Sequence, residues 1–143
     1  MTTSPLSRLH NHGQCFWLDS LSRRMLDDGS LERRIHDQGL SGVTSNPAIF
    51  AKAMLGASPA DRAAYDPRIR VARQTTSPGD AEIDVRAIYE RLAVDDVRDA
   101  CDLLLPRWEQ AMTDRAGVDG CVSLEVSPHL AHDTHATVLE ARR

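Results

Sequence analysis

The stretch Gly42-Val43-Thr44-Ser45-Asn46-Pro47-Ala48-Ile49-Phe50 decides how this sequence folds. The run from Leu40 to Ser45 is short and apolar, which is typical of a buried parallel strand. Asn46 stands where a helix N-cap belongs, and Pro47 occupies the first helical position. We therefore expect a strand that leads directly into a helix, with polar side chains at the junction.

Two further segments show the same pattern of a strand-like run with a polar side chain at its end. Cys15 to Asp19 ends in a carboxylate, and Cys121 to Val126 carries Glu125. The carboxyl ends of parallel strands meet at one edge, and β/α barrels hold their active sites there. The strands predicted near residues 15–19, 41–45 and 121–126 should pair in parallel, adjacent in that order, with right-handed crossovers. The expected fold class is α/β.

Helix capping alone could explain some of these polar residues. Asp19 could cap a helix that begins near Leu21, and Asn46 could do no more than cap the helix that starts at Pro47. Glu125 is harder to explain in this way, because a carboxylate within an apolar strand segment is costly to bury.

Three segments, in order, resemble the N-terminal part of transaldolases, and the best match is the longer bacterial subfamily found in actinobacteria. They are Trp17–Arg23, Gly42–Phe50, and Ser123–Pro128 with Leu130–Thr134, and the likeness extends over residues 14–55 and 84–143. Transaldolases are (β/α)8 barrels that transfer a dihydroxyacetone unit from sedoheptulose 7-phosphate to glyceraldehyde 3-phosphate in the pentose phosphate pathway. The family uses a lysine Schiff base, so the resemblance implies a transferase of sugar phosphates with no cofactor.

The resemblance also implies a role for each polar strand end. Asp19 matches the carboxylate that moves the proton of the C4 hydroxyl during aldol cleavage. Glu125 matches the glutamate that acts through water in forming and hydrolysing the Schiff base, and Thr44 helps to hold a catalytic water. Asn46 matches the asparagine that binds the dihydroxyacetone portion of the substrate. The expected catalytic residues are therefore Asp19, Glu125 and Thr44, with Asn46 in substrate binding.

The nucleophilic lysine of the family is not found in this sequence. It lies on the fourth strand in a segment resembling Ile-Lys-Ile-Pro, whereas the only lysine here is Lys52, which we expect to face solvent on the helix after Asn46. A closed barrel needs about 250 residues, so a chain of this length holds about three βα units. We expect residues 1–143 to form a single incomplete barrel domain, truncated before the lysine strand and inactive alone.

Two alternatives to a transaldolase fragment stay open. One is a non-catalytic half-barrel that acts through self-association or fragment complementation, because an incomplete sheet leaves open edges for pairing. The other is a related enamine-forming aldolase, to which residues 123–133 fit less well.

Composition excludes several classes of partner. The 21 acidic and 17 basic residues give a net charge of −4 with no long run of either sign, so neither nucleic acid nor a membrane surface is an expected partner. The first thirteen residues lack the apolar core of a signal peptide, and no stretch approaches the ~20 apolar residues of a membrane span. The expected location is the cytoplasm.

Cysteine and histidine spacing predicts no metal site. The three cysteines, Cys15, Cys101 and Cys121, lie in apolar surroundings, which indicates buried free thiols. The cluster formed by His129, His132, Asp133 and His135 does not have the spacing of a zinc site.

The remaining sequence predicts helices of uneven clarity. Short helices are expected at 21–26 and 31–38, the second capped by Ser30, and residues 56–83 read as a connecting region because of their prolines. Asp84 and Asp95 are expected to cap two separate helices, with Pro106 kinking or breaking the second. The predicted buried stripe of that helix comprises Val97, Cys101, Leu104, Leu105, Trp108 and Met112. Asp133 is the expected cap of the last helix.

Overall fold

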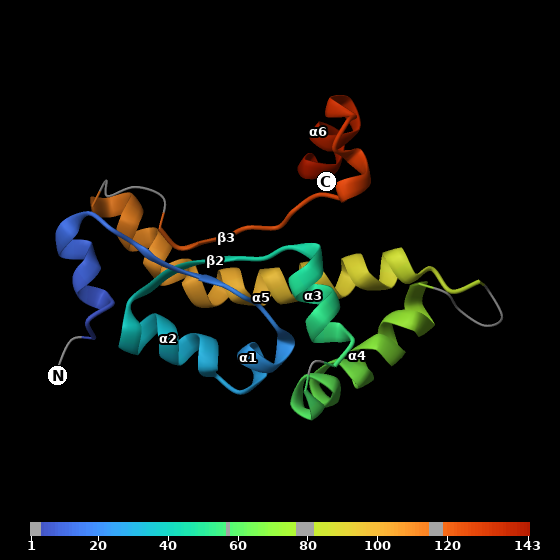
Figure 1. Ribbon diagram of the computed structural model, residues 1–143, viewed down its shortest axis with the longest axis horizontal. Helices are drawn as coiled ribbons and strands as arrows, with labels where there is room; N and C mark the ends of the chain where they lie inside the picture. Colours follow the sequence, from blue (N-terminus) through green and yellow to red (C-terminus); the bar gives the residue numbers. More distant parts are fainter. Residues whose placement is uncertain (1–3, 57, 77–81, 115–118) are drawn as a thin grey trace.

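A computed structural model describes residues 4–56, 58–76, 82–114 and 119–143 (Figure 1). Strands and helices alternate along most of the chain. The elements are η1 (Ser7–His12), β1 (Phe16–Asp19), α1 (Arg23–Asp27), α2 (Ser30–Gln38), β2 (Leu40–Thr44), α3 (Pro47–Met54), α4 (Pro59–Thr76), α5 (Val85–Asp114), β3 (Cys121–Val122), η2 (Pro128–Leu130) and α6 (Thr134–Arg142).

The three strands form one parallel sheet in the order β1-β2-β3, which confirms the α/β class and the predicted pairing. Strand β3 is shorter than the run 121–126 that the sequence predicted. One further ladder bond follows it, from Ser123 N to Val43 O at 2.9 Å. The carbonyl oxygen of Ser123 instead accepts a hydrogen bond from the Ser45 hydroxyl at 2.6 Å, so the chain leaves the ladder at this point.

Alternating side chains give the sheet two different faces. Phe16 and Leu18 pack with Val43 and Val122 into the apolar core on the helix side. Trp17 lies between Phe16 and Leu18 and therefore points to the opposite face. There it covers Gly42, where an added Cβ would meet the indole at 2.5 Å. This second face is the one that carries Asp19 at its edge, two residues after Trp17.

The main core lies between the sheet, α1, α2, α3 and α5. Its fully buried members include Leu31, Leu40, Phe50 and Leu104, with Leu21 just before α1, and α1 itself contributes Met25 at 9% exposure. A smaller cluster of Ala72, Ile88 and Leu92 joins α4 to α5. Figure 1 shows α5 running along the sheet as the longest helix, so it ties the separate βα units together.

Helix α5 is one continuous helix, which corrects the prediction of two separate helices beginning after Asp84 and Asp95, and Pro106 does not break it. Asp84 caps it as expected, since its Oδ1 accepts a hydrogen bond from Ala87 N at 2.9 Å. Asp95 lies inside the helix. A proline disturbs the carbonyl four residues earlier, but Pro106 and Asp102 are both exposed, so water can satisfy that carbonyl.

The buried stripe of α5 is also displaced from the predicted one. Leu104 is buried as predicted, but Leu105, Trp108 and Met112 are exposed by 47%, 42% and 61%. The stripe instead comprises Ile88, Leu92, Ala93, Asp96, Ala100, Leu104 and Ala111. Small alanines allow α5 to approach the sheet closely, and the large apolar residues on the neighbouring face stay in contact with solvent.

Residues 59–76 form helix α4, although the sequence predicted a connecting region there. The Ser58 hydroxyl accepts a hydrogen bond from Asp61 N at 3.1 Å and donates to Asp61 Oδ2 at 2.6 Å, which is a reciprocal N-terminal cap. Pro59 sits in the first turn, where proline is favourable. Pro67 is exposed, as is Ala63 four residues earlier, so the helix continues through it.

Smaller elements show one further difference. Ser30 is the first residue of α2 and not its cap, because Gly29 holds the N-cap position with φ 69°. Asp133 does cap α6, accepting from Ala136 N at 2.9 Å. Figure 1 places α6 away from α1–α4, at the end of the segment after β3. Ion pairs of Arg86 with Glu140 and of Arg143 with Glu90 join it to α5.

Candidate active site

Asp19 and Thr44 are the last residues of neighbouring strands and face each other in register. The Thr44 hydroxyl donates a hydrogen bond to Asp19 Oδ1 at 2.6 Å, and the Asp19 side chain is exposed at the edge of the sheet. Asp19 therefore does not cap the following helix, which begins only at Arg23 with Ser22 as its N-cap. The pair presents a carboxylate with one oxygen already held and the other available for a ligand.

Asn46 lies two residues beyond β2, in extended backbone with φ −148° and ψ 167°. Its Oδ1 accepts a hydrogen bond from Ile49 N at 2.9 Å, and Pro47 follows at the first helical position, as the sequence predicted. This cap uses only the oxygen of the amide. The Nδ2 group keeps two donor hydrogens that can serve a substrate hydroxyl.

Glu125 follows β3 by three residues and is exposed, which overturns the expectation that it occupies a costly buried position. It lines a groove between α5 and residues 124–129, together with Tyr89 and Arg86. Burial, and then the negative charge of Glu125, raise the pKa of the Tyr89 phenol. Glu125 thus lies beyond the carboxyl end of β3, as Asn46 lies beyond that of β2, and the groove that it lines is formed by α5 and also by Pro47.

Ser45 and Ser123 join the ends of β2 and β3, and sequence reasoning singled out neither of them. The Ser45 hydroxyl donates to Ser123 O at 2.6 Å, and Ser45 N donates to the Ser123 hydroxyl at 3.2 Å. Ser45 is only 2% exposed. This double link fixes the residues on either side of it, Thr44 and Leu124, and so sets where the strand ends stand relative to each other. A serine directly after each strand is the only sequence signal for it.

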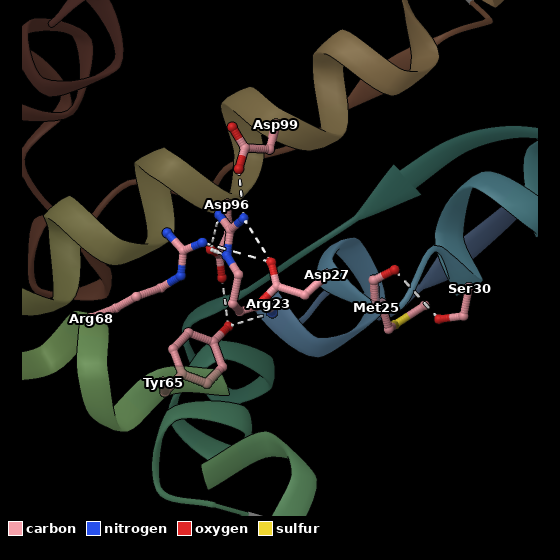
Figure 2. Close-up of polar contacts among 8 residues, drawn as sticks. All are labelled: Arg23, Met25, Asp27, Ser30, Tyr65, Arg68, Asp96 and Asp99. Carbon is pink, nitrogen blue, oxygen red and sulfur yellow. Dashed lines mark hydrogen bonds and ion pairs between the residues drawn. The ribbon is translucent and has the colours of Figure 1, made fainter. Parts of the chain in front are cut away.

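A buried ion pair holds the turn that follows Asp19. Figure 2 shows Arg23 against Asp96 and Asp99 of α5, with Tyr65 of α4 beside them. Arg23 Nε and Nη2 contact Asp96 Oδ1 at 2.8 and 2.6 Å, and the Tyr65 hydroxyl donates to Asp96 Oδ2 at 2.5 Å. Arg23 N in turn donates to the Tyr65 oxygen at 3.0 Å. In the sequence Arg23 looks like an ordinary surface charge, so the network was missed.

The charges of this network stabilise each other. Burial lowers the pKa of the Arg23 guanidinium, but the hydrogen bond to Asp99 and the charge of Asp96 reverse this, and the pKa lies above its usual value. Burial raises the pKa of the Asp96 carboxyl, while the donors Tyr65 and Arg23 oppose that rise. Burial and the charge of Asp96 raise the pKa of the Tyr65 phenol, which keeps its proton as a donor.

Lys52 is exposed on α3, as the sequence predicted.

The cysteines differ from the prediction of buried thiols: all three are free, but Cys15 and Cys101 are exposed and Cys121 is half-buried. Their apolar sequence neighbours point to the core, whereas Cys15 precedes β1 and Cys101 lies on the outer side of α5. No helix within the described ranges combines the length and apolar character that a membrane crossing requires.

The sequence is similar to a known protein family and to several of its members. Residues 16–143 match the family model described as Transaldolase/Fructose-6-phosphate aldolase. The chain is similar to a transaldolase of Thiobacillus denitrificans, with 51% identity over 141 residues that cover 99% of this chain and 34% of the relative. It is also 41% identical to Transaldolase 2 of Nostoc punctiforme, over 100% of this chain and 34% of that protein.

A third relative matches the chain over a similar share of its length. A transaldolase of Mycobacterium bovis is 40% identical over 136 residues, which cover 95% of this chain and 32% of the relative. The chain therefore spans about a third of the length of the curated relatives it matches, 34% for the Thiobacillus denitrificans protein.

Proposed function

Because the chain belongs to the transaldolase/fructose-6-phosphate aldolase family, we propose that it supplies one side of a transaldolase active site. The proposed reaction is the transfer of a dihydroxyacetone unit from sedoheptulose 7-phosphate to glyceraldehyde 3-phosphate. We propose that the protein acts in the cytoplasm. The domain we propose is an incomplete (β/α)8 barrel over residues 1–143. The Schiff-base lysine then belongs to a later strand that this chain does not contain.

The hydrogen bond between Thr44 and Asp19 is the observation that carries the proposal. Aldol cleavage needs a base that takes the proton of the C4 hydroxyl and later returns it. A carboxylate at a strand end, with one oxygen held by a neighbouring strand, is fixed in position yet open to a ligand. Such fixed placement of a proton acceptor is what makes general acid/base catalysis effective.

Asn46 and Glu125 are proposed to act on either side of this base. The Asn46 amide, anchored through its oxygen at the start of α3, donates to the dihydroxyacetone portion. Glu125 works through water in forming and hydrolysing the Schiff base, and the link between Ser45 and Ser123 helps to position its segment. Thr44, besides holding Asp19, contributes to binding that water.

Lys52 is not proposed as the nucleophile. It lies on the exposed side of α3, in the outer helix layer, whereas the imine must form on the face that carries Asp19. A catalytic Schiff-base lysine also needs surroundings that depress its pKa, such as a desolvated pocket or a second cation. An exposed helix position offers neither.

A chimera tests the proposal directly. This chain would be joined to the part of the Thiobacillus denitrificans relative that follows its aligned third, and transaldolase turnover would be measured. We expect the chimera to be active, and Asp19→Asn to lower kcat by about 10²–10⁴-fold, the usual contribution of a general acid/base. Asp37→Asn, an exposed carboxylate on α2, is the matched control and should keep full activity. Full turnover in the Asp19→Asn chimera would contradict the proposal.

A further inference from the structure

Three side chains with metal-ligating atoms lie together at the opposite edge of the sheet from Asp19. They are His10 in η1, Cys15 directly before β1, and Asp119 two residues before β3, and their ligand atoms all lie within 4.8 Å of one another. They line a pocket of about 250 Å³ that Gln14 and Arg107 help to close. The cluster is therefore accessible to an ion, and it is separate from the candidate active site.

The hydrogen bonds of His10 determine which of its ring nitrogens carries a lone pair. An Arg107 Nη2 donor contacts His10 Nε2, and arginine has no acceptor, so Nε2 carries the lone pair. The Ser41 hydroxyl lies 3.2 Å from the same nitrogen and can also donate to it. Nδ1 then carries the proton and donates it to Gln14 O at 3.2 Å. A histidine held by a backbone carbonyl through one nitrogen, with the other unprotonated, has the tautomer of a metal ligand.

The Cys15 sulfur and an Asp119 carboxylate oxygen lie within 4.8 Å of each other and of a ring nitrogen of His10. The Asp119 carboxylate beside the Cys15 thiol, together with burial, raises the pKa of that thiol, so a bound ion must displace its proton. Arg107 supplies the positive charge on this side of the pocket, and it occupies the His10 lone pair.

We propose that His10, Cys15 and Asp119 form a binding site for one divalent transition-metal ion, Zn²⁺ by preference, with water as the fourth ligand. One nitrogen, one sulfur and one carboxylate oxygen are the ligand types that Zn²⁺ takes in four-coordinate sites. When the ion binds, the Cys15 sulfur gives up its proton to solvent and Arg107 leaves His10 Nε2. The bound ion joins η1 to the amino ends of β1 and β3, which are far apart in the sequence.

Titration of the chain with Zn²⁺ and with Co²⁺ tests the site. Calorimetry should give one ion per chain, and Co²⁺ should show the near-ultraviolet absorption band of a cobalt–thiolate bond. Cys15→Ser and Asp119→Asn should each weaken binding at least tenfold, and Cys15→Ser should remove the thiolate band. Far-ultraviolet circular dichroism of both variants checks that they fold, and the exposed position of Cys15 makes its variant the safer one.

Two control variants should leave metal affinity unchanged, and a third variant should increase it. Cys101→Ser removes another exposed free thiol and His129→Asn an exposed imidazole, and neither should change the affinity. Arg107→Gln should tighten binding, because it removes the cation that competes for the His10 nitrogen. An affinity unchanged in Cys15→Ser, lost in Cys101→Ser, or weakened in Arg107→Gln would overturn the proposal, as would the absence of stoichiometric binding.

Discussion

Asn46 has one observed role, as a helix cap, and one proposed role in substrate binding, and substitutions can separate the two. Its Oδ1 caps α3 through Ile49 N, while Nδ2 remains for the proposed substrate contact. Sequence reasoning predicted the cap correctly, because Asn followed by Pro at a strand end is a strong local signal.

The prediction for Asn46 compares two substitutions in the active chimera. Asn46→Asp keeps a capping oxygen and loses the amide donor, so stability should stay within a few tenths of a kcal/mol while turnover falls. Asn46→Ala loses both functions and should also cost about 1 kcal/mol of stability. Thermal unfolding and steady-state kinetics measure the two effects. Unimpaired kinetics of Asn46→Asp would exclude the amide from substrate binding.

At the scale of single residues, the sequence predicted those features that depend on a local pattern and missed those that depend on distant parts of the chain. Asp19, Thr44 and Asn46 were placed correctly at the strand ends because each belongs to a local strand pattern. The exposure of Glu125 and of Cys15 was predicted wrongly, since it depends on where the chain turns away from the sheet. The Arg23 network joins residues 31 to 76 positions apart, and no local pattern indicates such pairs.

At the scale of elements, this buried network holds α1, α4 and α5 together. Arg23 is 2% and Asp96 0% exposed, whereas the second partner of Arg23, Asp99, has a side chain that is 53% exposed. The turn that carries Asp19 into α1 is therefore anchored to the long helix on the other side of the core.

Removing one buried partner should destabilise the fold strongly. Asp96→Asn leaves the Arg23 charge without its buried counterion and should lower the free energy of unfolding by about 3 kcal/mol or more. Asp99→Asn, at the exposed end of the same arginine, should cost at most about 1 kcal/mol. Urea unfolding followed by circular dichroism gives both values. Equal losses for the two variants would mean that burial does not distinguish them.

Helix predictions failed at Pro59, Pro67, Pro106 and Asp95, although Asp84 and Asp133 cap helices as predicted. Pro59 begins α4, and Pro67 and Pro106 lie on exposed helix faces, so none of them ends a helix. Asp95 resembles a cap in sequence, but its neighbour Asp96 is needed inside α5 to meet Arg23. Tertiary packing decided these cases, and a single sequence shows little of it.

For the whole molecule, the three-stranded sheet has β1 and β3 at its edges. Apolar residues also remain exposed, among them Leu124 after β3 at 45% and Val138 in α6 at 41%. Open strand edges and uncovered apolar groups favour association with other copies or with a complementary chain.

We predict that the isolated chain self-associates in a concentration-dependent manner. Sedimentation velocity over a range of protein concentrations should show species larger than the monomer. Adding the remaining part of a relative as a separate chain should reduce the amount of these self-associated species. A chain that stays monomeric and unfolds sharply and reversibly at low concentration would be contrary to this prediction.

The central claim is that this chain positions the substrate and moves its proton, while the nucleophilic lysine lies outside it. Borohydride reduction in the presence of fructose 6-phosphate, followed by mass spectrometry, tests this most directly, because it marks the lysine that forms the imine. We predict a stoichiometric adduct in the chimera on a lysine outside residues 1–143, unchanged by Lys52→Arg, and no specific adduct on the isolated chain. A stoichiometric adduct on Lys52 would contradict the account.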